Sequence, residues 1–414
     1  MYQFLLLLLP LAVLAKDIRV GKDQPYKTIT EAIAIAENGD RIIVGKGIYK
    51  EGNININKSL TLIGEGRPIL DGEMKHEIVS FRAPRIVFKG FKLRNSGFHA
   101  VKNIGAMRLH ASHNSIIENN IFENNYYGIF IQSSHQCLIQ NNTFTSNRGS
   151  SEESIGNAIH GYSSKELWIK NNRMSGHKDG IYLEKISKSY IYHNYSKKNR
   201  RYGLHFMLSN QNVFIANVFD NNAAGVAVMY SEKVDMVHNK FINNWGDSIY
   251  GLLLKDISHS KIKNNYFHSN TTAVYADGAT EIGFYNNEFT DNGWGLKINA
   301  NCRENTLNHN NFINNTFDVS TNGTLVMNHF KQNYWDKYEG YDLDKNQIGD
   351  VPFHPLSLYS VLVQQNESVM LLFKTFLIDL LDRTEKIIPS LTPENFVDNE
   401  PKMKPNPTFN QQLK

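Results

Sequence analysis

Residues 262–289 read IKNNYFHSNTTAVYADGATEIGFYNNEF, and the phrase that opens this stretch returns at its end. Asn265 and Asn287 occupy equivalent places 22 residues apart, and Phe267 and Phe289 follow them two residues later. Between the two copies lies AVYAD, a short run with strand-like alternation. A repeated unit this short, with asparagine at its turns, indicates a solenoid rather than a globular domain.

The same phrase recurs along most of the chain at a period near 22 residues, and a short alternating strand follows most of its copies. The asparagines in register are Asn120, Asn142, Asn172, Asn194, Asn217, Asn239, Asn265, Asn287, Asn310 and Asn333. We therefore expect an all-β, right-handed parallel β-helix of the pectin-lyase type. Its asparagine column would satisfy the turn backbone, and its phenylalanine column would fill the interior.

Two of the spacings are longer than the rest, and the extra residues must leave the coil as loops. These loops are RGSSEESIGN at residues 148–157 and NWGDSIY at residues 244–250. Both emerge at one corner of the solenoid, where we expect them to carry function, since loops often do.

The two ends of the chain depart from the repeat. Residues 1–15, MYQFLLLLLPLAVLA, fit a secretory signal peptide. Residues 16–114 should hold the first coils and a capping helix over residues 28–36, and residues 115–356 the β-helix core. Residues 357–391 have apolar residues at helical spacing and predict an amphipathic helical segment. Residues 392–414 form a polar, proline-rich tail that we expect to be disordered.

Composition sets broad limits on function. The 414 residues carry a net charge of only +4, so the chain shows no demand for a nucleic-acid partner. Its two cysteines, Cys137 and Cys302, lie about seven coils apart, which is too far for a disulfide bond. We expect each to be a small buried residue.

Alternation within the strands predicts which side chains face water. In GLHFM, residues 203–207, Leu204 and Phe206 point one way and His205 and Met207 point the other. Apolar residues recur at the first pair of positions in the other strands, so that face is the interior. Met207 and Met229 hold the same place in successive coils, and stacked strands lie about 4.8 Å apart. The two methionines are therefore expected to be neighbours on the outer surface.

This outer surface has two interpretations. The thioethers of Met207 and Met229 beside His205, with Glu184 and His160 as further members, suit a soft cation such as Cu(I). The same methionines are also typical of an adaptable contact surface for a protein partner. The residues taken alone favour the contact surface.

The stretch YDLDKNQIGD places Asp342, Asp344, Asn346 and Asp350 at positions 1, 3, 5 and 9 of a calcium-loop pattern. Gln347 stands where that pattern needs glycine, and position twelve lacks its glutamate. A loop built from Asx turns explains the same residues equally well.

Parallel β-helices often act on polysaccharides, so a secreted lyase or glycoside hydrolase is the alternative function. A glycosidase needs two carboxyl groups across the scissile bond. The outer face offers Glu184 and Asp277 four coils apart with Lys255 between them, which is poor catalytic geometry. Asp179, at the edge of a strand, is expected to cap a turn. The sequence thus favours a protein that is not an enzyme.

Several longer segments resemble the NosD family of periplasmic proteins that assist the maturation of nitrous-oxide reductase. The resemblance runs from the N-terminal cap to about residue 394, and KNQIGD at residues 345–350 departs from it, because similar proteins tend to carry an Asp-Gly pair there. The segments are RYGLHFMLSNQN (201–212), AAGVAVMYSEKVDMVHNKFINNWG (223–246), YGLLLKDISHS (250–260), GWGLKINANC (293–302), NTFDVSTNG (315–323), NYWDKYEGYDLDKNQIGDVPFHPLSL (333–358) and IIPSLTPE (387–394).

The resemblance implies a non-enzymatic role in copper delivery. Its implied partners are an ABC-type ATPase, a membrane permease, a copper-chaperone lipoprotein and nitrous-oxide reductase, and the copper would be bound transiently as Cu(I). It supplies no ligand set, but it brings the metal interpretation of the methionine pair level with the contact surface.

The resemblance also suggests a use for the helical segment at residues 357–391. Its apolar stripe would dock on the permease at the outer side of the inner membrane. An equal alternative is that the segment caps the end of the solenoid. The docking residues would be Phe373, Phe376, Leu377, Leu380 and Leu381.

Overall fold

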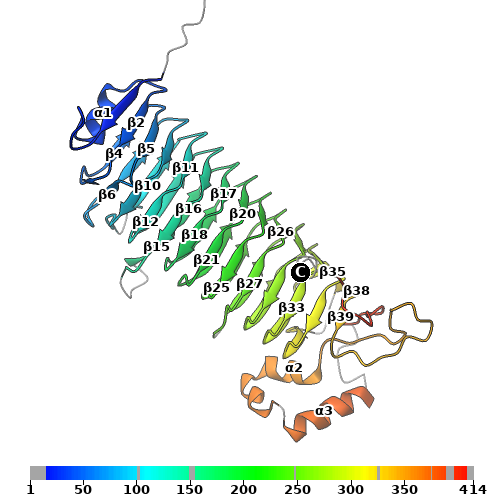
Figure 1. Cartoon of the computed structure of the whole chain (residues 1–414). Coiled ribbons are helices and arrows are strands. Elements are labelled where there is room, and N and C mark those ends of the chain that lie inside the picture. Colours follow the sequence, from blue (N-terminus) through cyan, green and yellow to red (C-terminus); the bar gives the residue numbers. More distant parts are fainter. Residues whose placement is uncertain are drawn as a thin grey trace, which may run out of the picture.

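The computed structural model describes residues 15–99, 103–148, 154–246, 249–323, 327–373, 375–387 and 396–407. Within them the chain winds into a solenoid with three parallel sheets, and each coil adds one strand to each sheet (Figure 1). This confirms the right-handed parallel β-helix predicted from the repeat. All but the last residue of the predicted signal peptide lies outside the described residues.

The three sheets are called sheet 1, sheet 2 and sheet 3 in the order in which each coil visits them. Within the described residues, sheet 1 contains β1 (Asp17–Val20), β2 (Arg41–Val44), β5 (Thr61–Gly64), β8 (Val87–Lys89), β11 (Ile116–Glu118), β14 (Leu138–Gln140), β17 (Trp168–Lys170), β20 (Tyr190–Tyr192), β23 (Val213–Ile215), β26 (Asp235–Val237), β29 (Lys261–Lys263), β32 (Gly283–Tyr285), β35 (Arg303–Asn308) and β38 (Met327–Lys331). Sheet 2 contains β3 (Ile48–Tyr49), β6 (Ile69–Asp71), β9 (Lys92–Arg94), β12 (Ile121–Glu123), β15 (Thr143–Thr145), β18 (Arg173–Ser175), β21 (Tyr195–Lys197), β24 (Val218–Asp220), β27 (Lys240–Ile242), β30 (Tyr266–His268), β33 (Glu288–Thr290), β36 (Asn311–Ile313) and β39 (Tyr334–Trp335). Sheet 3 contains β4 (Ile54–Ile56), β7 (Val79–Phe81), β10 (Gly105–His110), β13 (Tyr127–Gln132), β16 (Ile159–Tyr162), β19 (Ile181–Glu184), β22 (Tyr202–Met207), β25 (Ala224–Met229), β28 (Tyr250–Lys255), β31 (Thr272–Asp277), β34 (Trp294–Ile298) and β37 (Phe317–Ser320).

The asparagines of the repeat form a buried column at the corner between sheets 1 and 2. The amide nitrogen Nδ2 of Asn217 donates to Oδ1 of Asn239 (3.0 Å) and to the carbonyl of Ile191 (2.9 Å). The same Oδ1 accepts the backbone N–H of Asn217 (3.0 Å). Every side-chain donor and acceptor is thus used inside the protein, which is what a buried amide requires.

The residue before each column asparagine occupies the left-handed region of backbone space. Asn264 and Asn286 have φ values of 56° and 52°, and His193, His238 and His309 share this place with φ values of 54°, 55° and 56°. Asparagine and histidine tolerate this conformation better than most residues. In the doubled asparagine of the repeat, the first residue therefore suits the left-handed turn and the second forms the buried column.

The phenylalanine column fills the interior beside sheet 2. Phe267 stacks on Phe241 with ring centroids 4.5 Å apart, and Phe312 stacks on Trp335 at 4.3 Å. These rings are fully buried or nearly so. Each coil therefore covers the apolar surface of the previous one, as a solenoid requires.

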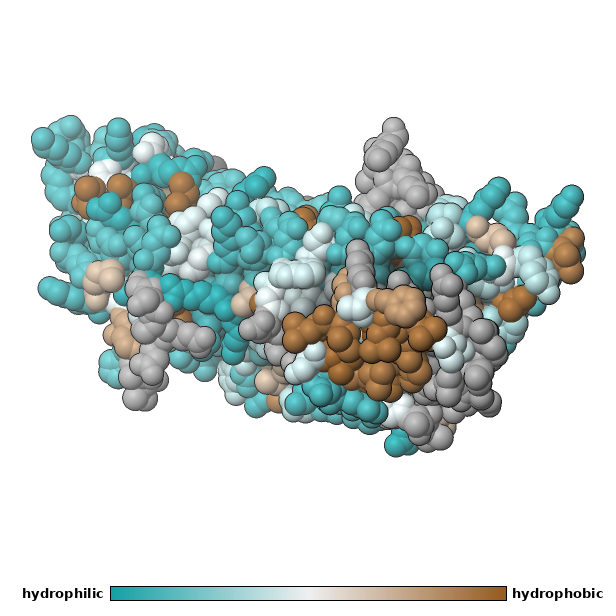
Figure 2. All heavy atoms as spheres, turned by 90° about the horizontal axis from the view of Figure 1, so that it is seen from below, coloured by the Kyte–Doolittle hydropathy of each residue, from teal (hydrophilic) through white to brown (hydrophobic). Residues whose placement is uncertain are grey.

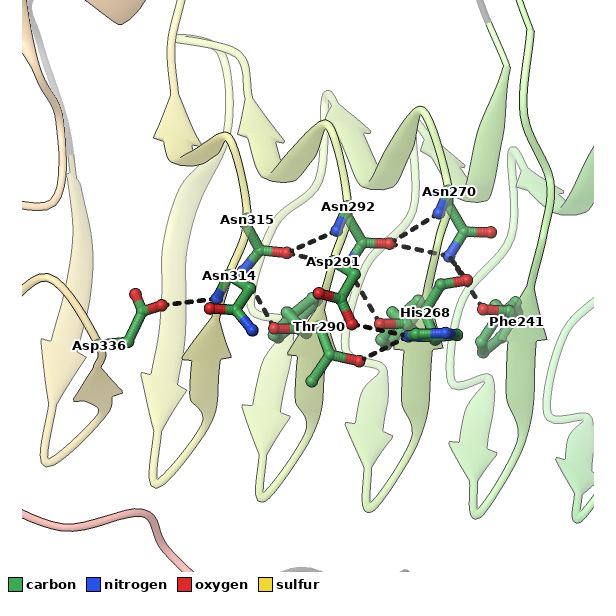
Figure 3. Close-up of polar contacts among 11 residues, drawn as sticks. Phe241, His268, Asn270, Thr290, Asp291, Asn292, Asn314, Asn315 and Asp336 are labelled. Atoms are coloured by element: carbon green, nitrogen blue, oxygen red, sulfur yellow. Dashed lines mark hydrogen bonds and ion pairs between the residues drawn. The ribbon is translucent and has the colours of Figure 1, made fainter. Parts of the chain in front are cut away.

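A second asparagine column lies at the corner between sheets 2 and 3 (Figure 3). It was not predicted from the repeat. The backbone N–H of each member donates to Oδ1 of the next at 3.0–3.3 Å, as in Asn270 to Asn292 (3.0 Å) and Asn292 to Asn315 (3.1 Å). A sequence signal exists, because asparagine follows the column phenylalanine by three residues in most repeats. The members are Asn199, Asn222, Asn244, Asn270, Asn292 and Asn315.

The N-terminal end of the solenoid is covered by α1 (Ile29–Ile35), as predicted (Figure 1). Thr28 is its N-cap and forms a capping box with Glu31, which satisfies the first helical N–H groups. The Lys58 ammonium closes the other end by donating to the carbonyl groups of Ile33 (2.8 Å) and Ala36 (2.6 Å). The buried residues of the helix are Ile29, Ala32 and Ile33.

In the described part of the predicted amphipathic segment, three helices follow the last coil: α2 (Leu358–Gln365), the 3₁₀ helix η2 (Glu367–Leu372) and α3 (Phe376–Ile387). Tyr359 and Val363 of α2 and Ile378 of α3 form a small core with Trp294 and Phe317, which begin the last two strands of sheet 3. The helices therefore pack against the C-terminal coils. No helix in the described ranges is both long and apolar enough to cross a membrane.

The expectation that the tail is disordered is wrong for residues 396–407. Phe396 and Asp398 are completely buried, and Asp398 and Phe353 exchange two backbone hydrogen bonds of 2.9 Å. The tail adds backbone to the open end of the solenoid, where the last coil would otherwise leave donors unpaired. Its polar composition hid this role, because its key contacts are hydrogen bonds rather than apolar packing.

Asp398 ends the first asparagine column, so its replacement tests the column directly. Its Oδ2 accepts from Nδ2 of Asn333 (2.9 Å) and Nε1 of Trp335 (3.2 Å). Because Asp398→Ala leaves these buried donors unpaired, we expect it to lower the free energy of unfolding by about 2–4 kcal/mol in urea titrations. Glu400→Ala, on the same tail but at a partly exposed carboxylate, should cost much less, because its partner Lys331 stays hydrated. Equal effects of the two substitutions would contradict this role for Asp398.

Candidate metal centre on sheet 3

The strand register of sheet 3 places the two methionines of the sequence prediction side by side. Met207 at the end of β22 pairs with Met229 at the end of β25, and Glu184 of β19 pairs with Met207 on the other side. Lys255 of β28 follows Met229. The outer column therefore runs carboxylate, thioether, thioether, ammonium. All four side chains are partly exposed.

His205 belongs to this face but is less exposed than the alternation suggested. It lies two residues before Met207 on β22, and its side chain is only 5% exposed. The rings of Tyr182 and Tyr202 cover it, with centroids 4.9 and 4.8 Å away. Tyr182 from the preceding coil and Tyr202 from the same strand thus turn an outward-facing strand position into a buried one.

The imidazole of His205 has no hydrogen-bond partner at either ring nitrogen in the described part of the chain. Oδ2 of Asp179 lies 3.9 Å from its Nδ1. Burial lowers the pKa of His205 to about 4, although Asp179 opposes this shift. The ring is therefore neutral at physiological pH, which is the form that binds metals.

His160 does not join His205. The ring of Tyr182, on the strand between them, separates the two imidazoles. Its centroid lies 4.7 Å from that of His160 and 4.9 Å from that of His205. Nδ1 of His160 is instead within hydrogen-bond distance of Nδ2 of Asn157 (3.1 Å). The strand register thus puts Glu184, Met207 and Met229 in one column, places His205 two residues before Met207 on the same strand, and leaves His160 apart.

Sequence reasoning missed an ion pair beneath this cluster. The carboxylate of Asp179 is fully buried and accepts from Nε of Arg201 (2.9 Å) and from the backbone N–H of Tyr202 (3.1 Å). These contacts reach the next coil rather than a turn of the coil that contains Asp179, so they do not show the turn cap that was expected. Asp179 and Arg201 are 22 positions apart, so a search for opposite charges one period apart would have found them.

The donors on this face fit a soft cation better than a hard one. Thioether sulfur and neutral imidazole are ligands that Cu(I) prefers, and Glu184 adds one negative charge nearby. Among the described residues, no group of three or more His, Cys, Asp or Glu side chains is placed to hold a metal ion. Metal binding on this face therefore depends on the methionines.

The predicted calcium loop uses its oxygens internally. The carboxylate of Asp342 accepts the backbone N–H groups of Asn346 (3.1 Å) and Gln347 (2.8 Å), and Asp350 accepts that of Leu343 (2.7 Å). Oδ1 of Asp344 also accepts from Asn346. These contacts match the Asx-turn interpretation.

The two carboxylates that the sequence offered for glycoside hydrolysis, Glu184 and Asp277, lie far apart on this face. Four strand spacings separate Glu184 from Asp277, because Met207, Met229 and Lys255 lie between them. At about 4.8 Å per strand the gap is roughly 19 Å, twice the widest separation used by glycosidases. Asp179 is held by Arg201 beneath the surface and is not available as a partner.

The two cysteines are buried and unbridged, as expected. The Sγ of Cys137 donates to the carbonyl of Ser112 (3.0 Å), and burial raises the pKa of the thiol to about 11. A thiol that stays protonated is a poor metal ligand.

Fold and site together define a class: a parallel β-helix that presents soft metal donors where paired carboxylates would be needed for hydrolysis. The fold is shared with carbohydrate-active enzymes. A GH87 alpha-1,3-glucanase catalytic domain in complex with tetrasaccharides matches with a TM-score of 0.64 at 12% identity, over 78% of this chain and 69% of that one. The Yersinia enterocolitica family 28 exopolygalacturonase matches with a TM-score of 0.55 at 12% identity, over 76% and 78%.

The chain belongs to the family described as periplasmic copper-binding protein (NosD), which matches residues 35–199 and 150–340. The "Probable ABC transporter binding protein NosD" of Pseudomonas aeruginosa strain PAO1 is 25% identical, over 95% of this chain and 94% of the relative. The protein of the same description from Stutzerimonas stutzeri is 23% identical over 43% of this chain and 44% of its own length. These matches support a periplasmic, copper-related accessory role.

The neutral imidazoles of this region predict a pH dependence of stability. Burial lowers the pKa of His160, His177 and His205 to about 4 each, below the value of about 6.5 for an exposed histidine. The unfolded chain therefore binds more protons between these values. Stability should be fully present above pH 6.5 and should fall as the pH is lowered toward 4.

Substitution of one histidine measures this effect. His205→Phe should reduce the slope of unfolding free energy against pH by up to about 1.4 kcal/mol per pH unit in that window. Urea titrations between pH 4 and pH 7 provide the slope. His329→Phe, at a mostly exposed histidine of β38, is the control and should leave the slope unchanged. A His205→Phe protein with the full slope would show that His205 is not buried neutral.

Proposed function

We propose that this protein is a periplasmic, non-enzymatic platform that holds Cu(I) briefly on sheet 3 and passes it on for assembly of nitrous-oxide reductase. The observation that carries the proposal is the register that stacks Met207 on Met229, between Glu184 and Lys255. The family description supports copper as the cargo. The description of both relatives as probable ABC transporter binding proteins supports an association with an ABC transporter.

The chemistry of the column suits transfer rather than storage. Thioethers are neutral and weakly basic, so they bind Cu(I) without having to lose a proton. Glu184 attracts the ion electrostatically from one end of the column, and Lys255 repels it from the other. The half-exposed sulfur atoms leave room for a ligand from a donor or acceptor protein. The ion would be held between Glu184 and the two sulfurs, with His205 beneath.

The second part of the proposal concerns the C-terminal helices. Their outward side carries a broad apolar surface, which is the brown cluster in Figure 2. Leu371 is 86% exposed and Phe376 is 81% exposed, whereas Leu381, also predicted to dock, packs partly against the core with Ile378. Soluble proteins rarely leave such a patch uncovered. This surface, called here the helical apolar face, consists of Leu371, Leu372, Phe373, Phe376, Leu377 and Leu380.

We infer that the helical apolar face docks on the membrane permease. The same helices pack against Trp294 and Phe317 of sheet 3 through Tyr359, Val363 and Ile378, so packing and docking would use opposite sides of one segment. Docking there would hold the solenoid on the outer side of the inner membrane, with sheet 3 exposed to the periplasm. ATP hydrolysis would belong to a separate ATPase subunit.

Replacing both sulfurs tests the copper site. Met207→Leu with Met229→Leu keeps the volume and removes the soft donors, so the protein should lose one equivalent of Cu(I) in titrations against a competing chelator. Met327→Leu, at an exposed methionine on sheet 1, is the matched control and should bind as before. Unchanged stoichiometry in the double variant, together with unchanged copper loading of the reductase, would contradict the site.

Polar substitution on the helices tests docking. Phe376→Ser with Leu380→Ser should abolish co-purification with the cognate permease and leave Cu(I) binding intact, because these side chains are exposed and distant in the fold from sheet 3's methionines. Leu343→Ser changes an equally exposed apolar residue outside the helices and should have no effect. Retained co-purification of the double variant would refute the docking surface.

A further inference from the structure

A pocket of about 370 Å³ lies on the outer face of sheet 3, near the N-terminal end of the solenoid. Arg108 and His110 belong to β10, Gln132 ends β13, and Arg82 directly follows β7. Each of these side chains can donate a hydrogen bond. Among the described residues the lining contains no carboxylate and consists of Arg82, Asn103, Arg108, His110 and Gln132. The pocket therefore suits an anion.

One wall of the pocket is a fixed arginine. Nε of Arg108 donates to Glu77 (2.8 Å), Nη2 donates to the carbonyl of Asn103, and Cζ lies 5.0 Å from the ring centroid of Phe130. The other carboxylate oxygen of Glu77 accepts from the hydroxyl of Ser80 (2.6 Å). The Arg108 side chain is only 21% exposed. Glu77 thus both orients Arg108 and balances its charge.

Arg82 supplies the charge that is left without a counter-ion. Its Nε donates to Oδ1 of Asn55 (3.4 Å). Within the part of the chain that the structure describes, the two terminal nitrogens of Arg82 have no hydrogen-bond partner and no carboxylate pairs with the guanidinium. A guanidinium in this state offers two parallel N–H groups, which match the two oxygens of a carboxylate.

The pocket lies in line with the copper column. Gln132 pairs with Tyr162, Tyr162 pairs with Glu184, and Glu184 pairs with Met207. Three strand spacings, or roughly 14 Å, therefore separate Gln132 from Met207 along one outer face. A folded domain of ordinary size is wider than this. A protein seated over the methionines consequently also covers the pocket.

The position of the pocket indicates where its anion comes from. Arg82 is exposed, so a small free carboxylate would gain little from pairing with it in water. A carboxylate carried by a docked protein loses no further translational freedom on entering the pocket. A lipid phosphate is out of reach, because β10 lies toward the end covered by α1 and the helical apolar face lies at the opposite end (Figure 1).

We propose that this pocket, called here the Arg82 pocket, binds an aspartate or glutamate side chain of the protein that receives copper from sheet 3. The inference rests on the transfer part of the proposed function. The incoming carboxylate pairs with Arg82, and His110 and Gln132 donate to it from the same face. The contact fixes how the receiving protein is oriented over the methionines.

The test measures the affinity of the full chain for purified apo nitrous-oxide reductase by surface plasmon resonance, at low and at high ionic strength. Arg82→Gln removes the charge and should weaken binding about threefold or more at low ionic strength, with a flatter dependence on salt. Arg82→Lys keeps the charge without the parallel N–H groups and should recover part of the affinity. Its own Cu(I) stoichiometry should not change in either variant.

Arg85→Gln is the matched control, because Arg85 is an equally exposed arginine three residues away that does not line the pocket. It should bind the reductase as the unmodified protein does. Equal losses in Arg82→Gln and Arg85→Gln would show that only the overall charge matters and would overturn the proposal. Equal melting temperatures of the variants ensure that a loss of binding is not a loss of fold.

The outcomes separate the Arg82 pocket from the copper site. If Arg82→Gln weakens binding while Met207→Leu with Met229→Leu keeps its copper, the pocket stands and the copper site falls. If Arg82→Gln binds the reductase normally, the pocket is overturned whatever the methionine variant does. An unmodified chain that does not bind the reductase would overturn both the inference and the transfer part of the proposed function.

Succinate titrations distinguish a free carboxylate from one on a protein. Succinate that binds the chain alone and loses affinity in Arg82→Gln, while the reductase binds both proteins equally, would identify a small dicarboxylate as the occupant. That result would overturn the proposal. We expect the reverse, with the reductase sensitive to Arg82→Gln and succinate bound too weakly to compete.

Discussion

The hydrogen bond from the amide of one coil to the amide of the next is the interaction on which the rest of the structure depends. Because Oδ1 of Asn239 accepts both the backbone and the side-chain N–H of Asn217, a coil cannot slip by a residue without leaving buried donors unpaired. The column therefore fixes the register of all three sheets. Both asparagine columns have a direction, because each amide donates toward the C-terminal end. A carboxylate accepts the last amide of each column, Asp398 in the first and Asp318 in the second.

The candidate metal centre on sheet 3 follows from this register. Residues distant in sequence become neighbours only because successive coils superimpose, and Glu184, Met207, Met229 and Lys255 form a column in that way. The aromatic residues beside the column bury His205 and keep its imidazole neutral. Such a column needs no dedicated loop, because the pairing of successive strands alone brings its side chains together.

Much of the fold was predictable from the sequence because the same residue pattern occurs in many coils. The period identified the asparagine column, the interior face and the pairing of Met207 with Met229, and an amphipathic pattern predicted α1. Features that occur once escaped prediction. The burial of His205 depends on Tyr182 and Tyr202 from two coils, and the ordered tail depends on one carboxylate, Asp398. Neither leaves a periodic signal.

The central claim is that sulfur on sheet 3 holds the copper ion, and the most direct test is X-ray absorption at the copper edge of the protein loaded with one equivalent of Cu(I). The account predicts two sulfur scatterers with one lighter nitrogen or oxygen scatterer in the first shell. A first shell made only of nitrogen and oxygen scatterers would contradict it, because the thioethers of Met207 and Met229 would then take no part in binding.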